Sequence, residues 1–264
     1  MVHKLTGKNI IITGASGGIG EQMATLCAER GANLVLLARN FEKLNQLKAE
    51  LENRFRVNVN VHKLDVSDTS EVEAVFSNIL SELNHVDVLV NNAGFGVFRE
   101  ASEASVDEIK GMFAVNVVGL MACTRMVLPK MREQGSGHII NIASQAGKIA
   151  TPKSSVYSAT KHAVLGYTNS LRMELSKHNV YVTAINPGPI ETNFFAIADE
   201  KGTYVKNVKK YMLKPEYVAK KVVGAMLTPT REINLPRWMN AGSIVYALFP
   251  RLFERLGRSA FEKK

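Results

Sequence analysis

Two side chains suited to acid–base chemistry, Tyr157 and Lys161, stand four positions apart. Residues 154–177 are predicted to form a helix, which places both side chains on one face, one turn apart. A free phenol titrates near ~10 and is a poor base at neutral pH, but a nearby ammonium favours the phenolate and lowers its pKa. The spacing therefore predicts a tyrosine that acts as general acid and base.

A serine is expected to share the substrate oxygen with this tyrosine. Ser144 follows the apolar run 139–143, which is typical of a buried strand, and precedes Tyr157 by 13 positions. At the carboxyl end of a strand, its hydroxyl is placed to donate a hydrogen bond to a carbonyl oxygen and to hold that oxygen against the phenol. This combination makes chance a poor explanation for the Tyr–Lys pair.

The elements that position these side chains alternate along the whole chain. Apolar, β-branched runs follow segments of helical periodicity, which is typical of βαβ units in a parallel sheet. The expected strands are residues 9–13, 33–38, 57–64, 86–91, 138–143, 180–186 and 232–235. The expected helices are residues 18–30, 41–54, 69–83, 105–133, 154–177 and 215–227. The predicted fold class is α/β: one domain with a doubly wound parallel sheet of seven strands and helices on both faces.

A glycine-rich turn, TGASGGIG at 13–20, lies between the first predicted strand and the first predicted helix. Gly14 permits a tight turn, Gly18 lets the backbone approach a pyrophosphate, and Gly20 permits close packing of the helix. The positive end of that helix would face the phosphate. The turn therefore predicts a dinucleotide site, with a purely structural turn as the alternative.

The second predicted strand ends at Ala38-Arg39, nineteen residues after Gly20, where dinucleotide enzymes bind the adenosine ribose. An NAD-binding protein usually offers a carboxylate there, whereas the 2′-phosphate of NADP favours an arginine. Arg39 therefore favours NADP(H), with an ordinary solvated arginine as the alternative. Asp65 and Val66 follow the third strand and are expected beside the adenine.

Composition and charge limit the class of protein. The 264 residues are 46% hydrophobic and 22% charged, which is typical of a globular domain. No apolar run is expected to span a bilayer, and no signal peptide is expected before the first strand. Cys27 and Cys123 fall in separate predicted helices, and the six histidines lack metal-ligand spacing. We therefore expect a cytoplasmic protein without a metal.

The net charge of +9 is concentrated in the last third of the chain. Residues 199–221 and 231–264 each contain seven basic and three acidic residues, so each contributes +4. The first 198 residues are nearly neutral, which argues against a nucleic-acid partner.

Six motifs together resemble the short-chain dehydrogenase/reductase family, and they occur in its order between residues 8 and 235. They are TGASGGIG at 13–20, NNAG at 91–94, a helical Asn116, Ser144, YSATK at 157–161 and NPG at 186–188. The resemblance implies a Rossmann-type fold and a catalytic tetrad of Asn116, Ser144, Tyr157 and Lys161. In that tetrad the tyrosine is the acid/base, and the lysine lowers its pKa and holds the nicotinamide ribose. The serine polarises the carbonyl and the asparagine supports a proton-relay water, although a purely structural Asn116 is the alternative.

The same resemblance implies where the cofactor binds. The expected residues are Gly14, Ser16, Gly18, Ile19, Gly20, Arg39, Asp65, Val66, Asn92, Ala93, Gly94, Tyr157, Lys161, Pro187, Gly188, Ile190 and Thr192. NADP-preferring relatives often carry a second basic residue just before the middle glycine, where this chain has Gly17. The preference for NADP(H) therefore depends on Arg39.

The family places its substrate lid at residues 189–214, which show no clear periodicity here. Four aromatic residues, Phe194, Phe195, Tyr204 and Tyr211, suit a hydrophobic substrate and a lid that excludes water. Lysines at 206, 209 and 210 either attract an anionic group or form a solvated face, and the solvated face is the commoner case.

A catalytic domain, residues 1–240, is expected to be followed by an amphipathic helical tail, residues 241–264. Pro250 should divide the tail region into two helices. The second helix is expected to carry apolar Leu252, Phe253 and Leu256 on one side and basic Arg251, Arg255 and Arg258 on the other. The substrate pocket, a second subunit of a homodimer or homotetramer, or a membrane surface would cover the apolar side. Cover by protein is favoured, so peripheral membrane contact is the less favoured reading.

Three classes of function fit these features. The leading one is an NADP(H)-dependent reductase of a ketone or aldehyde on a hydrophobic small molecule, with the same groups serving alcohol oxidation. An epimerase or dehydratase with a tightly bound dinucleotide is the first alternative, but the TGxxxGxG spacing and the lack of a large second domain count against it. A non-catalytic cofactor-binding regulator is the second alternative, and the complete tetrad counts against it.

The cofactor assignment is tested by Arg39→Asp. The change removes the cation that would face the 2′-phosphate of NADP and places a carboxylate where NAD carries a ribose hydroxyl. We expect the preference to move toward NAD by a few kcal/mol at most, with the larger loss for NADP. Values of kcat/KM with both cofactors, in wild type and variant, check this. A wild type that already prefers NADH would rule the assignment out.

Overall fold

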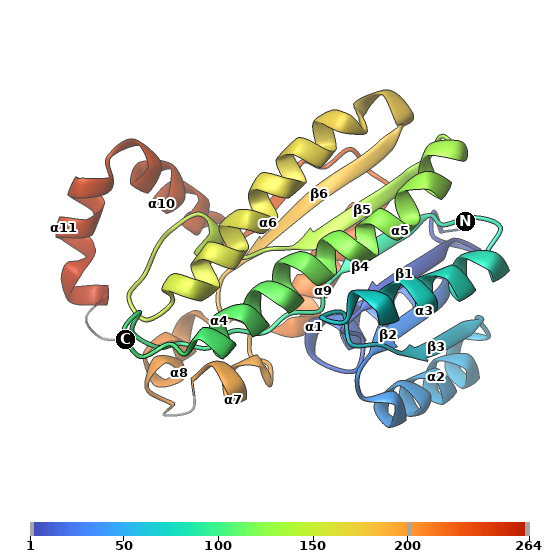
Figure 1. The fold of residues 1–264 in the computed structure, drawn as a ribbon, viewed down its shortest axis with the longest axis horizontal. Coiled ribbons are helices and arrows are strands. Elements are labelled where there is room, and N and C mark those ends of the chain that lie inside the picture. Colours follow the sequence, from blue (N-terminus) through green and yellow to red (C-terminus); the bar gives the residue numbers. More distant parts are fainter. Residues whose placement is uncertain (1–2, 200–201, 262–264) are drawn as a thin grey trace.

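Seven parallel strands form one sheet in the computed structural model, which describes residues 3–199 and 202–261 but not the side chains of Thr203 and residues 257–261 (Figure 1). The strands are β1 Asn9–Thr13, β2 Asn33–Ala38, β3 Val59–Lys63, β4 Val88–Asn91, β5 Gly137–Ile142, β6 Val180–Pro187 and β7 Glu232–Leu235. Their order is β3-β2-β1-β4-β5-β6-β7. The predicted doubly wound sheet is confirmed, with strand ends within two residues of those expected.

The sheet changes direction beside β1. Ile11 of β1 is paired with Val35 of β2 on one side and with Leu89 of β4 on the other. The chain runs outward from β1 to β3, returns to β4 and then runs outward again to β7. Connections on the two sides of this point leave in opposite directions, so a crevice opens at the carboxyl ends of β1 and β4.

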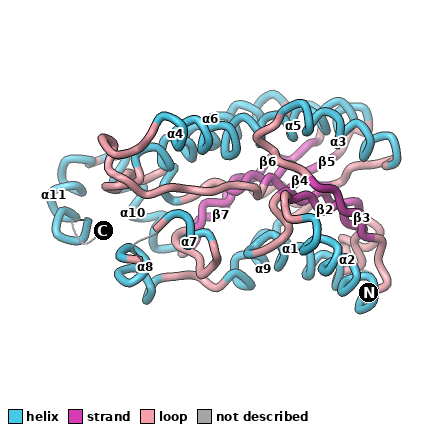
Figure 2. Tube along the Cα trace, turned by 60° about the horizontal axis from the view of Figure 1, so that its bottom comes forward, coloured by secondary structure: helices cyan, strands magenta, loops and turns pink. Residues whose placement is uncertain are grey.

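Helices cover both faces of the sheet (Figure 2). One face carries α1 Gly18–Glu29, α2 Phe41–Phe55 and α9 Pro215–Ala225. The other carries α3 Thr69–Glu82, α4 Val106–Phe113, α5 Leu120–Glu133 and α6 Ser155–Glu174. Local chemistry sets their starts, because Asp68 caps α3 and Ser105 forms a capping box with Glu108 at α4. Pro215 opens α9, where its missing N–H costs nothing.

The predicted helix 105–133 is not a uniform α-helix. Between α4 and α5 the structure has a π-helical turn, η1 Ala114–Gly119. The whole segment Val106–Glu133 is long and apolar enough to cross a membrane, contrary to the expectation that no such run exists. Its buried side packs against α3 and α6, so it serves as a core helix of the fold.

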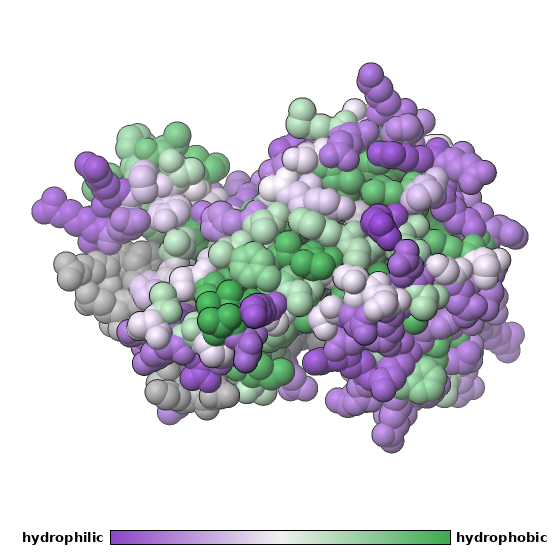
Figure 3. Space-filling model, in the orientation of Figure 1, coloured by the Kyte–Doolittle hydropathy of each residue, from purple (hydrophilic) through white to green (hydrophobic). Residues whose placement is uncertain are grey.

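The lid is more helical than expected, whereas the tail forms the two helices that the sequence predicts. The lid contains α7 Phe194–Ala198, α8 Thr203–Val208 and the 3₁₀ turn η4 Lys209–Tyr211 instead of irregular chain. Further 3₁₀ turns, η2 Gln145–Gly147 and η3 Ser176–His178, flank α6. The tail forms α10 Arg237–Leu248 and α11 Pro250–Phe261, so the break predicted at Pro250 is confirmed. These two helices project from the body and carry apolar surface (Figures 1 and 3).

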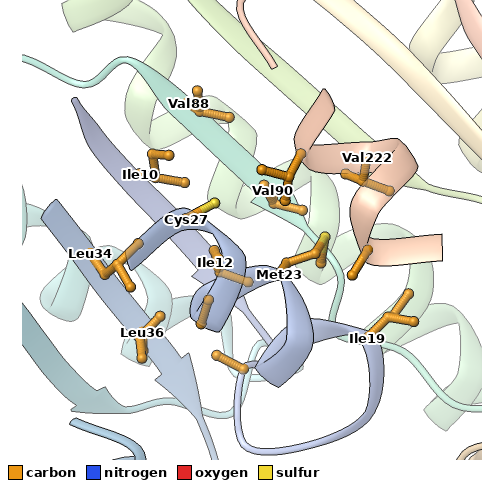
Figure 4. Close-up of a cluster of buried hydrophobic side chains, with 14 of the residues drawn as sticks. Ile10, Ile12, Ile19, Met23, Cys27, Leu34, Leu36, Val88, Val90 and Val222 are labelled. Carbon is orange, nitrogen blue, oxygen red and sulfur yellow. The ribbon is translucent and has the colours of Figure 1, made fainter. Parts of the chain in front are cut away.

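Two apolar clusters lie on the two faces of the sheet. On one face, Ile10 and Ile12 of β1 meet Met23 and Cys27 of α1 and Val222 of α9 (Figure 4). On the other, Ile11 belongs to a cluster that includes Phe76 of α3 and Val127 of α5. Successive residues of one strand thus enter opposite clusters, which is why the central strands are apolar along their whole length. Both cysteines are buried free thiols, as expected.

Gly119 shows how closely the π-helical turn packs against the turn that follows β3. A Cβ on Gly119 would lie 2.4 Å from the carbonyl oxygen of Val66. We expect Gly119→Ala to lower the free energy of unfolding by at least about 2 kcal/mol, because backbone has to move to accept the methyl group. Gly166→Ala in α6 is the matched control, since a Cβ there meets nothing within 4 Å.

Urea denaturation of both variants provides the measurement. Gly166→Ala should be neutral or raise the free energy of unfolding by about 0.5–1 kcal/mol, since it only removes backbone freedom from an exposed helical position. Equal stabilities for the two variants would contradict the packing described for Gly119.

Candidate active site

The glycine turn between β1 and α1 has the close contacts expected from its sequence. Gly14 has φ +66°, and a Cβ there would lie 2.9 Å from the Cα of Ala93. A Cβ on Gly20 would lie 2.3 Å from the carbonyl oxygen of Gly14. Side chains are therefore excluded at both positions, and the N-terminus of α1 reaches the crevice directly.

Hydrogen bonds join this turn to the end of β4. The hydroxyl oxygen of Thr13 accepts bonds from the N–H groups of Asn92 and Ala93, each at 3.0 Å. The Asn92 side-chain amide donates to the carbonyl oxygens of Thr13 and Gly14, also at 3.0 Å. The Asn92 side chain thus supports the glycine turn, and these four bonds fix the turn relative to the end of β4.

A cleft of about 260 Å³ opens at the carboxyl ends of β1 to β4. Seven of the predicted cofactor residues line it: Gly14, Ser16, Arg39, Asp65, Val66, Ala93 and Gly94. Five other residues line the cleft and were not predicted as cofactor residues: Ala38, Asn40, Leu64, Phe95 and Val115. The position of Asn40 at the start of α2 could have been predicted, because it directly precedes a helical pattern. Its side chain caps α2 by accepting a hydrogen bond from the Lys43 N–H at 2.9 Å.

The rim of the cleft carries charges of both signs. Burial alone raises the pKa of Asp65, but the hydroxyl and N–H of Ser67 and the Arg39 guanidinium lower it below its ordinary value. Ser67 donates to the Asp65 carboxylate at 2.7 Å and 3.0 Å. Asp65 therefore remains ionised near the exposed Arg39. Side-chain-free glycines at a helix N-terminus fit the pyrophosphate of a dinucleotide.

Other predicted cofactor residues lie around the turn. Gly18 begins α1, and a Cβ on it would lie 3.4 Å from the Thr192 methyl group, so the start of the lid covers the turn. Ile19 faces inward and belongs to the apolar cluster beneath the sheet. Gly18 and Thr192 therefore lie at the crevice, whereas Ile19 and Gly20 support it from the side of the core.

The segment after β6 lies beside Ser144. The Ser144 hydroxyl is 3.4 Å from the carbonyl oxygen of Pro187, the last residue of β6. The Gly188 N–H donates to the Leu235 carbonyl oxygen at 2.6 Å, which holds this segment against β7. Ile190 forms a β-bridge with Leu213, which joins the two ends of the lid.

The structure brings the four predicted catalytic residues together. Ser144 shares a hydrogen bond with Tyr157, and the Lys161 nitrogen lies 5.7 Å from the centre of the Tyr157 ring. A Cβ on Gly94 would lie 3.0 Å from the Asn116 side-chain oxygen and 3.8 Å from the Lys161 nitrogen. The tetrad therefore surrounds the inner end of the cleft.

Asn116 has a clear structural role. Its side chain accepts from the Phe95 N–H at 3.0 Å and donates to the Phe95 carbonyl at 2.8 Å. It also donates to the Thr160 hydroxyl at 3.1 Å. Asn116 thus ties the loop after β4 to α6, and π-helical turns of this kind often occur at functional sites. These bonds support the structural interpretation, and the proton relay stays a prediction.

The electrostatics of Tyr157 differ from the sequence-based expectation. Burial raises the pKa of the Tyr157 phenol above its ordinary value, and the hydrogen bond with Ser144 offsets only part of this. Lys161 donates to the Ile142 carbonyl at 2.9 Å, and burial lowers the pKa of its ammonium to about 8. The prediction of a lowered phenol pKa is wrong for the protein itself, because desolvation of the buried phenol has the largest effect on this pKa. Tyr157 is therefore protonated at neutral pH.

Aromatic side chains cover the phenol. The ring centre of Phe98 lies 5.8 Å from that of Tyr157 and 5.2 Å from that of Tyr204, while Phe194 lies 5.6 Å from Tyr157. A Cβ on Gly96 would lie 2.9 Å from both the Tyr157 ring and the Phe194 ring. Phe98 was missed, since an isolated aromatic in a loop carries no periodic signal; only its position shortly after the NNAG motif pointed to the site.

A buried polar chain anchors the helices beneath the tetrad. Asn91 of β4 donates to the Thr124 hydroxyl of α5 at 2.8 Å and to the Asn141 side chain of β5 at 2.9 Å. Asn141 in turn donates to the Thr168 hydroxyl of α6 at 2.9 Å. The chain links α5 and α6 to the central strands and fixes the helix that carries Tyr157.

Comparisons with known proteins identify the family of the chain. The family model for short chain dehydrogenases matches residues 8–202. An uncharacterized oxidoreductase of Staphylococcus aureus (strain MRSA252) is 38% identical over 231 residues, covering 88% of this chain and 95% of the relative. An alcohol dehydrogenase from the archaeon Thermococcus sibiricus, complexed with 5-hydroxy-NADP, has a TM-score of 0.78 and 30% identity, covering 86% of this chain and 95% of its own.

A second similar structure contains a different cofactor. A short-chain dehydrogenase/reductase from Burkholderia phymatum in complex with NAD has a TM-score of 0.86 and 25% identity, covering 94% of this chain and 96% of its own. The chain described here belongs to the short-chain dehydrogenase family and is an oxidoreductase of that family.

The buried Lys161 predicts an unusual pH dependence of stability. Its pKa of about 8 in the folded protein lies below the ordinary 10.5, so the unfolded chain binds this proton more tightly. The buried charge of Lys161 therefore destabilises the folded protein less as the pH rises from about 8 toward 10.5. We expect the free energy of unfolding of wild type to rise, relative to Lys161→Met, by about 2 kcal/mol between pH 7 and pH 9.5.

Urea denaturation across this pH range checks the prediction. Lys177→Met is the control, because it removes an exposed lysine in η3, and wild type should gain no such stability relative to it. Parallel pH profiles for wild type and Lys161→Met would show that the Lys161 ammonium is not penalised by burial.

Proposed function

We propose that this oxidoreductase uses NADP(H) to reduce a ketone or aldehyde on a hydrophobic small molecule, and that it oxidises the corresponding alcohol in reverse. The observation that carries the proposal is the placement of Tyr157. Its phenol is hydrogen-bonded to Ser144, at the inner end of a cleft suited to a dinucleotide, beneath aromatic side chains. Such a site combines a proton donor with an apolar binding surface.

The preference for NADP(H) is supported by Arg39 at the rim of the cleft. One similar structure is complexed with an NADP derivative and another with NAD. Membership of the family therefore does not determine which cofactor is bound, and residues such as Arg39 would determine it. The glycine turn would hold the pyrophosphate, Asp65 and Val66 would flank the adenine, and Lys161 would hold the nicotinamide ribose. A bound NADPH would supply the hydride that the carbonyl carbon accepts.

The protein groups act on the carbonyl oxygen. Ser144 would donate a hydrogen bond to that oxygen and hold it against the Tyr157 phenol. Because burial keeps the phenol protonated at neutral pH, Tyr157 can deliver its proton as negative charge develops on the oxygen. The Lys161 ammonium stabilises the resulting phenolate, and Asn116 holds the surrounding backbone in place.

The aromatic wall indicates the class of substrate. Phe98, Phe194 and Tyr204 offer apolar surface next to the phenol and exclude water from it. Burial raises the pKa of Tyr204 to about 12, so this hydroxyl adds no charge at neutral pH. The lysines at 206, 209 and 210 are exposed to solvent whereas the phenol is buried, which argues against their binding an anionic group of the substrate.

We also infer a cytoplasmic enzyme that works as a homodimer or homotetramer without nucleic acid. The buried free thiols of Cys27 and Cys123 support a reducing compartment. The near-neutral first 198 residues give a nucleic acid no basic surface there.

The proposal is tested by Tyr157→Phe. The change removes the transferable proton and leaves the cofactor cleft unaltered, so we expect kcat to fall by roughly 10²-fold or more with little change in NADPH affinity. Steady-state rates with NADPH and a panel of hydrophobic ketones and aldehydes, together with NADPH fluorescence titration, provide the measurement. Tyr204→Phe, which removes another hydroxyl from the same aromatic group, should keep kcat near that of wild type. A Tyr157→Phe enzyme with a normal rate would end the acid–base assignment.

A further inference from the structure

Exposed apolar side chains are concentrated on the projecting tail. Fifteen large hydrophobic side chains are exposed in the described part of the chain, and seven of them lie between residues 237 and 256. They are Trp238, Ile244, Val245, Leu248, Phe249, Leu252 and Leu256, which we call the hairpin surface. A concentration of this kind on one projection marks an interaction site more often than chance exposure does.

The hairpin surface is exposed, although the opposite side of α10 is packed against other residues. On α10, Trp238, Ile244, Val245 and Leu248 share one side by the helical period. The other side is occupied, because Gly242 lies near Ile149 and Phe253, and the Tyr246 ring meets the Phe253 ring at 5.4 Å. The exposed stripe is thus a second apolar face, which the described residues 3–199 and 202–261 leave uncovered.

The second tail helix adds positive charge beside apolar residues. Leu252 and Leu256 are exposed one turn apart on α11, and Arg251 and Arg255 are exposed next to them. The predicted apolar side of this helix is therefore covered only at Phe253, which packs on α10. Among residues 237–256, Glu254 is the only acid. The side chain of Arg258 lies outside the described residues.

An aromatic pair continues this surface toward the lid. Trp238 and Tyr211 are about equally exposed, 60% and 61%, and their ring centres lie 6.5 Å apart. Lys209, Lys210 and Arg237 are exposed and directly precede these rings in the sequence. Tryptophan and tyrosine favour the boundary between lipid and water, where basic side chains meet headgroups. Figure 3 shows hydrophobic (green) surface on the α10–α11 projection and hydrophilic (purple) surface at its outer edge.

We propose that the hairpin surface docks on a bilayer that contains anionic phospholipid. The apolar stripe would enter the headgroup region, and Arg251 and Arg255 would meet anionic headgroups. A second copy fits this face less well, because a two-fold interface through it would bring the basic rows of both copies together. This charge pattern reverses the preference drawn from the sequence, in which cover by protein ranked first.

Docking would also place the lid at the membrane. The sulfur of Met239 in α10 lies 2.9 Å from the Cβ position of Gly188, directly before the lid. The Tyr211–Trp238 contact joins the other end of the lid to α10. A substrate dissolved in the bilayer would then reach Tyr157 without crossing bulk water. This last point depends on the proposed function, whereas docking itself does not.

The chain contains a built-in reporter for docking, because Trp238 is its only tryptophan. Full-length protein is mixed with vesicles of phosphatidylcholine alone or of phosphatidylcholine with phosphatidylglycerol, and tryptophan emission is recorded. We expect a blue shift with the anionic vesicles, quenching by brominated acyl chains, and loss of both at high salt. Unchanged emission with anionic vesicles would overturn the proposal.

Three variants separate lipid from other occupants. Leu248→Glu combined with Leu252→Glu should weaken vesicle partitioning by roughly tenfold or more, and Arg251→Gln combined with Arg255→Gln should flatten its salt dependence. Met173→Glu is the matched control, since it places the same charge on an exposed apolar residue of α6. Circular dichroism and the urea denaturation midpoint show that each variant is folded. Two results together would assign the surface to a second copy instead. Wild type would not bind vesicles, and the Leu248→Glu, Leu252→Glu variant would have a lower sedimentation mass than wild type in the absence of vesicles.

Discussion

A single hydroxyl group holds the crevice on which the rest of the site depends. The β1–β4 ladder ends at the pair Ile12 and Val90, directly before the chain must turn in two directions. Thr13 accepts the N–H groups of both Asn92 and Ala93 at this point, where they would otherwise be unpaired. These hydrogen bonds therefore join the glycine turn to the NNAG segment, and the positions of the cleft residues on both segments depend on them.

The catalytic helix is held by polar rather than apolar contacts where precision is needed. Asn141 bonds to Thr168 in the middle of α6, and Asn116 bonds to Thr160 near Tyr157. Buried hydrogen bonds of this type fix both direction and distance, which packing alone does not. The same helix carries the buried ammonium of Lys161, whose lowered pKa shows that its position is unfavourable for the folded protein. A residue that lowers stability in this way is typical of a functional site.

Much of the fold was predictable because its strands are buried on both faces and carry apolar residues at nearly every position. The tetrad was predictable because its chemistry fixes residue types and spacing. Properties that arise between distant segments were not predictable. Phe98 reaches Tyr157 only through the folded loop, and the π-helical turn at Asn116 depends on backbone partners 21 residues away. The predicted direction of the Tyr157 pKa shift was wrong, because helical spacing reveals a neighbouring charge but not how deeply the phenol is buried.

The π-helical turn Ala114–Gly119 also constrains how this chain can change in length. A π turn holds one residue more than an α turn, so the periodicity of α5 in the sequence is shifted by one position relative to that of α4. Loss of one residue within the π-helical turn would restore a regular helix and leave α4 and α5 facing nearly the same way. Loss of one residue from α4 or α5 would instead rotate the residues on one side of the deletion by roughly 100° relative to those on the other, and would turn part of the apolar side away from the sheet. Within this long helix, a change of length by one residue is therefore compatible with the fold at the π-helical turn and not in the regular turns beside it.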